Sequence, residues 1–82
     1  MKVRMNTYKT KFFALCPVNG ARIEYLLEIR SSDFIEVEAI NRAVLPLYSG
    51  FHEDFADQLK AALGGAQTLV AEHHGVTIIT ER

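Results

Sequence analysis

The sequence predicts an α+β fold of order β-β-α(α)-β-β, in which a four-stranded antiparallel sheet carries its helices packed on one face. Three observations indicate it. Two extended apolar segments flank a turn near the start, an amphipathic segment lies in the middle, and two more extended segments flank a turn at the end. The chain has 82 residues without a linker, repeat or low-complexity segment. Residues 1–82 are therefore expected to form a single small α+β domain.

The first two strands are predicted at residues 8–15 (YKTKFFAL) and 23–29 (IEYLLEI), which mix aromatic, β-branched and aliphatic side chains. Between them, Asn19 and Gly20 can take the positive φ angles of a tight reversal, and Pro17 has a fixed φ just before them. A β-hairpin is expected, with the only cysteine, Cys16, between the first strand and the turn.

A short helix is predicted after this hairpin. Val37, Ile40 and Val44 recur at spacings of three and four, which places them on one helical face, and the helix ends before Pro46. Its caps are expected among three preceding polar residues: Ser31, Ser32 and Asp33.

A longer helix is predicted between Ser49-Gly50 and Gly64-Gly65. Glu53 and Asp54 lie in its first turn, where the helix dipole favours negative charge. One face is apolar and is expected to join the core: Phe51, Phe55, Leu59, Ala62 and Leu63.

The last two strands are predicted at residues 68–72 and 76–80, around the turn His73-His74-Gly75. Together with His52 and Cys16, the two adjacent histidines raise the question of a metal ion. Neighbouring residues on a strand point to opposite faces, so both could ligate one ion only from within the turn. No metal site is predicted.

The composition argues against several functional classes. The net charge is −1 with no basic run, which argues against a mainly electrostatic attraction to nucleic acid. No stretch approaches the roughly 20 apolar residues of a membrane span, and a single cysteine cannot form an intramolecular disulfide. The cytoplasm is the expected compartment, without nucleic-acid or membrane partners. A nucleic-acid or regulatory role remains an alternative because the N-terminal segment is locally basic: Lys2, Arg4, Lys9 and Lys11.

The sheet face opposite the helices needs cover in a chain this small. A second copy can supply it, either by packing sheet on sheet or by joining strand edges into a barrel. A homo-oligomer is therefore expected.

Three segments carry a resemblance to one family: "ALCPVNG" at 14–20, "GFHEDFADQL" at 50–59 and "HHGVTIIT" at 73–80. They resemble, in the same order, the tunnelling-fold enzymes, which include GTP cyclohydrolase and the pterin synthases. Within that family they look most like the nitrile reductases that reduce cyano-deazaguanine in queuosine biosynthesis. The resemblance implies that Cys16 is the nucleophile and that His52 and Glu53 contact the substrate.

The chemistry of these positions agrees with those roles. A carboxylate in the first turn of a helix, such as Glu53, stays ionised and can accept paired hydrogen bonds from the N–H edge of a guanine-like or pterin-like base. A thiolate at Cys16 can attack a nitrile carbon to give a thioimidate, provided that the thiol is accessible and its pKa is lowered.

Two features depart from the family. The aspartate that donates a proton should lie seven positions after the cysteine, where this chain has Ile23, and the side chain of Glu24 should point to the opposite face of the strand. The serine- and lysine-rich cofactor motif is absent from "EVEAINRAVLPLYS" at 36–49. No cofactor is expected, and complete reduction of a nitrile is not expected either.

Two functional hypotheses follow. In the first, the chain binds a purine- or pterin-like heterocycle at an oligomer interface through Glu53 and His52, with Cys16 as nucleophile if a reaction occurs. In the second, the chain is a non-catalytic oligomerisation or protein-interaction module without a ligand.

Overall fold

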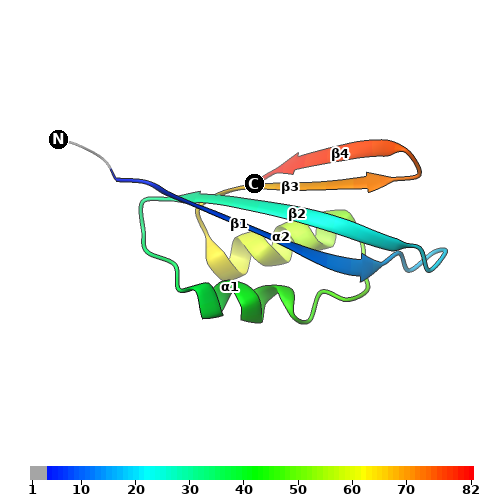
Figure 1. Cartoon of the computed structure of the whole chain (residues 1–82), viewed down its shortest axis with the longest axis horizontal. Helices are drawn as coiled ribbons and strands as arrows, with labels where there is room; N and C mark the ends of the chain where they lie inside the picture. Colours follow the sequence, from blue (N-terminus) through cyan, green and yellow to red (C-terminus); the bar gives the residue numbers. More distant parts are fainter. Residues whose placement is uncertain (1–3) are drawn as a thin grey trace.

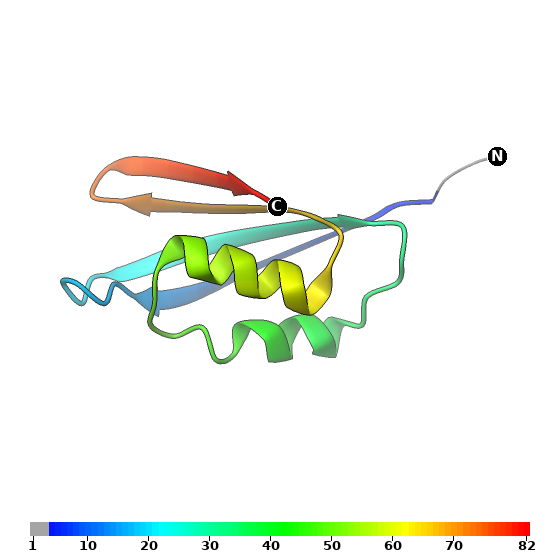
Figure 2. The same cartoon turned by 180° about the vertical axis from the view of Figure 1, so that it is seen from behind.

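The computed structural model describes residues 4–82, so Lys2 of the basic N-terminal cluster lies outside the described residues. Four strands form one sheet in the order β1-β2-β3-β4, and every neighbouring pair is antiparallel. Two helices lie side by side on one face of this sheet (Figures 1 and 2). The predicted α+β fold is confirmed. The elements are β1 (Asn6–Leu15), β2 (Arg22–Ser31), α1 (Val37–Val44), α2 (His52–Leu63), β3 (Ala66–His73) and β4 (Val76–Glu81).

The core lies between the sheet and the helices. On β2, alternate side chains from Ile23 to Ile29 are buried, while those between them face the other side of the sheet. Tyr25 stands opposite Phe12 on β1 and Ala71 on β3, which places the three side chains in one row beneath α2. The largest fully buried side chains are Tyr25, Ile29, Phe55, Leu59 and Leu69.

The turn between β1 and β2 differs from the expected tight reversal. Gly20 has a φ of 73°, but Asn19 does not adopt a positive φ. The side chain of Asn19 closes the turn instead, because its Oδ1 accepts a hydrogen bond of 2.9 Å from the Ala21 N–H.

The two-residue reversal with positive φ at both positions lies between β3 and β4. His74 has a φ of 50° and Gly75 a φ of 80°, as a type I′ hairpin turn requires. His73 therefore belongs to β3, and only His74 and Gly75 form the turn.

Helix α1 ends before Pro46 as predicted, but it begins later than the predicted caps imply, and Val37 does not lie on its buried face. Its N-cap is Glu36, without a side-chain cap, and the Ser31 hydroxyl accepts a hydrogen bond from the Asp33 N–H in the preceding loop. Val37 is the first helical residue and is 61% exposed, whereas Ile40 is buried.

Helix α2 is also shifted relative to the predicted stripe. Phe51 is the N-cap with extended backbone angles and is 54% exposed, and Ala62 is exposed as well. The helix ends where predicted, at Gly64 and Gly65, which both have positive φ. Its buried face consists of His52, Phe55, Ala56 and Leu59.

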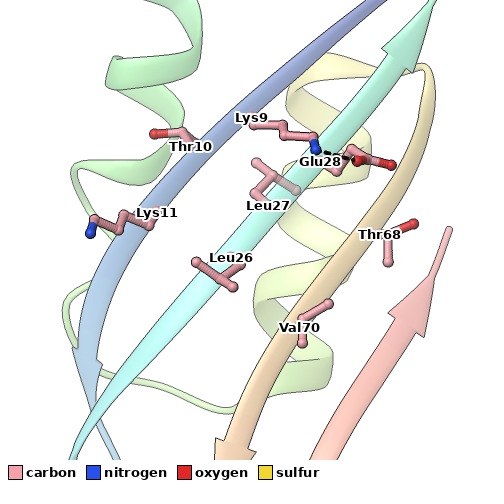
Figure 3. A pocket seen from close by; sticks show the side chains of 8 residues that line it. All are labelled: Lys9, Thr10, Lys11, Leu26, Leu27, Glu28, Thr68 and Val70. Carbon is pink, nitrogen blue, oxygen red and sulfur yellow. Dashed lines mark ion pairs between the residues drawn. The ribbon is translucent and has the colours of Figure 1, made fainter.

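The opposite face of the sheet carries apolar side chains that no element of residues 4–82 covers. Leu26, Val70 and Ile79 stand opposite one another on β2, β3 and β4, and Leu26 and Ile79 are exposed. A shallow groove of about 460 Å³ lies over β1, β2 and β3 (Figure 3). Lys9 and Glu28 are among the residues that line it (Figure 3), and their charged atoms lie 3.5 Å apart.

The molecule is elongated, at 49 × 24 × 16 Å, because the strands extend beyond the helices (Figure 1). Its radius of gyration is 13.1 Å. A compact chain of this length has a radius of about 12 Å. None of the helices within residues 4–82 is long and apolar enough to span a membrane.

Candidate functional site

Cys16 follows β1 directly and begins the turn. Its N–H donates a hydrogen bond of 2.8 Å to the Ala21 carbonyl, and its own carbonyl accepts one of 2.8 Å from Gly20. The side chain is half-buried and packs against the hydrophobic core. The thiol therefore lies at the rim of the core, on the same side of the sheet as the helices.

Tyr25 links this thiol to the helices. Its ring is fully buried and packs against the rings of Phe12, Phe55 and His52. Burial raises the pKa of the Tyr25 hydroxyl, and the charge of Cys16 raises it further. The phenol is thus held neutral beside Cys16.

Two imidazoles complete this group. His52 at the start of α2 and His73 at the end of β3 have ring centroids 5.6 Å apart, and Tyr25 lies 5.5 Å from the first and 6.0 Å from the second. His52 is only 6% exposed. Three buried ring nitrogens lack a hydrogen-bond partner within residues 4–82: Nδ1 and Nε2 of His52 and Nε2 of His73.

The electrostatics of His52 favour the neutral ring. Burial lowers its pKa most, and the neighbouring His73 lowers it further, while Glu53 opposes the shift. We call this group of Cys16, Tyr25, His52 and His73 the imidazole cluster.

Glu53 follows His52 in the sequence, but its carboxylate has different neighbours. The Thr80 hydroxyl donates a hydrogen bond of 3.2 Å to Oε1, and Arg82 Nη2 donates one of 2.9 Å to Oε2. The bond from Arg82 is the main reason that the pKa of Glu53 lies below its usual range. Both oxygens of the predicted ligand-binding carboxylate are therefore engaged within the chain.

Arg82 also reaches Asp57, one helical turn after Glu53. Its Nε donates a hydrogen bond of 2.8 Å to Asp57 Oδ1. Asp57 and, second, Glu53 raise the pKa of Arg82. We call Glu53, Asp57, Thr80 and Arg82 the carboxylate cluster.

The structure thus divides the predicted site residues between two groups. Cys16 and His52 belong to the imidazole cluster, and Glu53 belongs to the carboxylate cluster. The shallow groove over β1, β2 and β3 does not include them. A smaller hollow of about 270 Å³ does not include them either; it is lined by Phe13, Ala14, Leu15, Arg22 and Tyr48. The predicted site residues therefore line neither of these hollows.

The adjacent histidines His73 and His74 have different neighbours, since the first ends β3 and the second lies in the turn. His73 faces Tyr25, whereas His74 Nε2 lies 2.8 Å from Asn19 Nδ2 and so joins the tips of the two hairpins. Among residues 4–82, no group of three or more His, Cys, Asp or Glu side chains is arranged to hold a metal ion.

The position of the missing acid is also defined. Ile23 is buried on the helix side of β2, and Glu24 is exposed on the opposite side, next to Phe13 in the strand register. Glu24 therefore does not replace the expected aspartate.

The comparisons with known proteins bear on the fold. No protein-family model matches the sequence, and a search of curated proteins finds no significant match. The chain is similar to a crystal structure of the archaeosine synthase QueF-Like in its apo form, with a TM-score of 0.77 and 19% sequence identity. The match covers 95% of this chain and 90% of that one. The two chains share one fold.

Sequence reasoning missed several residues that surround the predicted ones. Strand alternation is the signal that could have placed Tyr25 and Thr80 on the helix side. In the structure they stand opposite the buried residues Phe12 and Leu69, respectively. Nothing in the sequence pointed to Arg82, whose role depends on where β4 ends beside α2.

Proposed function

We propose that this chain is a subunit of a homo-oligomer that binds a purine- or pterin-like heterocycle at the boundary between copies. The shared fold with an archaeosine synthase supports this function, as do the three segments that resemble tunnelling-fold nitrile reductases. In the proposal, Glu53 accepts hydrogen bonds from the N–H edge of the ligand, His52 supports that end of the site, and Cys16 lies at the other end.

The observation that carries the proposal is the placement of Glu53. Its carboxylate is ionised and 66% exposed at the start of α2, on the same helix as His52, and it lines neither of the two hollows described above. A heterocycle is bound tightly only where most of its surface is covered. A second copy supplies the missing wall.

The sheet edges support such an assembly. β1 and β4 are the edge strands and run antiparallel to each other, so β4 of one copy can pair with β1 of the next. Exposed Lys11 on β1 and exposed Glu81 on β4 give the two edges opposite charge. The elongated shape and the uncovered row of Leu26, Val70 and Ile79 agree with a subunit that is completed by its neighbours.

The chemistry proposed for Cys16 is limited to addition. The sulfur forms a bond to the nitrile carbon, one C–N π bond breaks, and the nitrogen takes up the proton that the thiol loses, which gives a thioimidate without any reductant. A later reduction of the thioimidate would need a proton donor at the position of Ile23. Because Ile23 is apolar, β2 does not supply that donor.

The test is ligand-induced stabilisation. Pterins and deazaguanines are screened by thermal melting, and a ligand at about 100 times its Kd stabilises the native state by about 2.7 kcal/mol. Glu53→Gln should abolish this shift. Asp54→Asn is the matched control, because it removes the same charge from the same helical turn. Unchanged melting across the whole panel would refute the proposal.

A second candidate function, a non-catalytic interaction module, is favoured by one observation. Both oxygens of Glu53 already accept hydrogen bonds from Thr80 and Arg82, as in a purely structural network. This function predicts assembly without any ligand response and an unreactive Cys16.

A further inference from the structure

Arg82 holds the carboxylate that the proposed ligand requires. Its backbone is fixed, because its N–H donates to the Gln67 carbonyl and its carbonyl accepts from the Gln67 N–H, both at 3.0 Å. Its side chain extends from the end of β4 to the first turns of α2, where Nη2 lies 2.9 Å from Glu53 Oε2. The guanidinium is thus placed by the sheet and directed at Glu53.

The guanidinium resembles the ligand edge that would displace it. A guanine-like or pterin-like base presents adjacent N–H donors in one plane, and a guanidinium presents the same arrangement. Glu53 therefore already binds a planar N–H donor, supplied by its own chain. A heterocycle that pairs with both oxygens of Glu53 competes with the Thr80 hydroxyl at Oε1 and with the Arg82 guanidinium at Oε2.

The contact is suited to exchange. The side chains of Glu53 and Asp57 are each 66% exposed, and exposed ion pairs are weak and screened by salt. Asp57 lies four residues after Glu53 on the same face of α2 and is bound by Arg82 Nε at 2.8 Å. When Glu53 is released, Asp57 can keep the guanidinium beside the site.

We propose that Arg82 competes with the ligand for Glu53. Its guanidinium occupies the Glu53 carboxylate until a ligand with adjacent planar N–H donors displaces it. This inference rests on the proposed function for its biological meaning. It sets a specificity filter, because a ligand with a single donor gains too little from Glu53 to offset the lost bond to Arg82. Amidines, guanidines and 2-amino-substituted pyrimidine rings belong to the accepted class.

The first experiment compares the affinity of wild type and variants for guanine, 7-deazaguanine and pterin. Arg82→Gln should bind about two- to fivefold more tightly, the factor that corresponds to one exposed ion pair. Asp57→Asn should bind more weakly than wild type, because Glu53 becomes the only carboxylate partner of Arg82. Arg30→Gln removes an exposed arginine outside the cluster and should bind as wild type does.

A structural role of Arg82 predicts the opposite pattern. Equal or weaker binding by Arg82→Gln, or tighter binding by Asp57→Asn, would overturn the inference. If Arg82→Gln fails to fold, Arg82→Lys replaces it, since the ammonium keeps the charge and loses the planar fork. Arg82→Lys should also bind more tightly than wild type, and a loss of affinity would count against the competing role.

A second readout separates this inference from the proposed function. Methylguanidinium at millimolar concentration is added while the carboxyl carbon of Glu53 is followed by NMR. Methylguanidinium should shift this signal at a lower concentration in Arg82→Gln than in wild type, whether or not any heterocycle binds. If it does so and no heterocycle binds any variant, the proposed function fails and the competing role of Arg82 stands. The same response in both proteins, or in neither, overturns the competing role.

Discussion

Gly65 offers the sharpest test of how the helices are joined to the sheet. It has a φ of 71°, and a methyl group on its Cα would lie 2.9 Å from the Arg30 carbonyl oxygen and 3.0 Å from Ile29 Cγ2. Gly64 has a similar φ of 66°, but a methyl group there would have nothing within 4 Å. Both glycines have a φ that L side chains rarely adopt, Gly64 with a ψ of −158°, and only Gly65 has a packing requirement as well.

The expected magnitudes follow from that difference. An L residue held at such a φ costs about 1–3 kcal/mol, which sets the effect of Gly64→Ala. Gly65→Ala adds a clash with backbone that can move little, and overpacking costs a further ~1–3 kcal/mol. For a domain of this size each kcal/mol lowers the melting temperature by about 4–8 °C. Gly65→Ala should therefore melt at least about 4 °C below Gly64→Ala.

The assay is thermal and urea-induced unfolding of wild type and both variants at one fixed protein concentration, followed by circular dichroism. The fixed concentration matters because assembly would make the melting temperature depend on it. Equal destabilisation by the two substitutions would refute the reasoning, since it would show that β2 does not approach Gly65 closely.

Two further predictions concern the imidazole cluster. Burial lowers the pKa of His52 from 6.5, so the unfolded chain binds a proton at this position more readily than the native chain does. The free energy of unfolding should therefore be highest above about pH 6.5 and decrease as the pH falls. His52→Phe should flatten this dependence in urea titrations between pH 5 and 8, whereas His74→Asn, which changes an exposed ring, should preserve it. Cys16 should react with iodoacetamide near neutral pH more slowly than free cysteine in the unliganded single chain, because it is half-buried beside a neutral phenol. Stoichiometric alkylation faster than that of free cysteine would contradict this prediction. It would also exclude the non-catalytic interaction module as the function.

The fold was largely predictable because it depends on local patterns. The strand-forming residues of β1 and β2 and the glycine pair after α2 are readable from residue type and spacing, and the structure confirms both. Errors arose where two segments offered similar signals. Asn19-Gly20 is the usual sequence of a type I′ turn, yet the reversal of that type lies at His74 and Gly75.

The helix faces were less predictable, since spacing alone does not fix where a helix begins. Val37 and Phe51 fit the apolar periodicity, but one is the first residue of its helix and the other precedes it, so both are exposed. The sequence predicts caps among Ser31, Ser32 and Asp33, but the chain continues in irregular structure to Glu36 before α1 begins.

The candidate site was predictable only in part. The first-turn position predicted an ionised Glu53 from the helix dipole, whereas the main cause of its lowered pKa in the structure is the hydrogen bond from Arg82. The contacts of Glu53 with Thr80 and Arg82 span 27 and 29 residues and depend on the register of β4 against β3. The pairing of His52 with His73 has the same origin, since it requires the end of β3 to lie beside the start of α2.

The central claim is that a heterocycle binds where two copies meet, with Glu53 as its acceptor. The most direct measurement is sedimentation velocity with absorbance detection of a bound pterin or deazaguanine, over protein concentrations that span assembly. The heterocycle should sediment with the oligomer and not with the monomer, and Glu53→Gln should assemble without carrying it. A heterocycle that sediments with the monomer, or an oligomer that carries none, would contradict the claim.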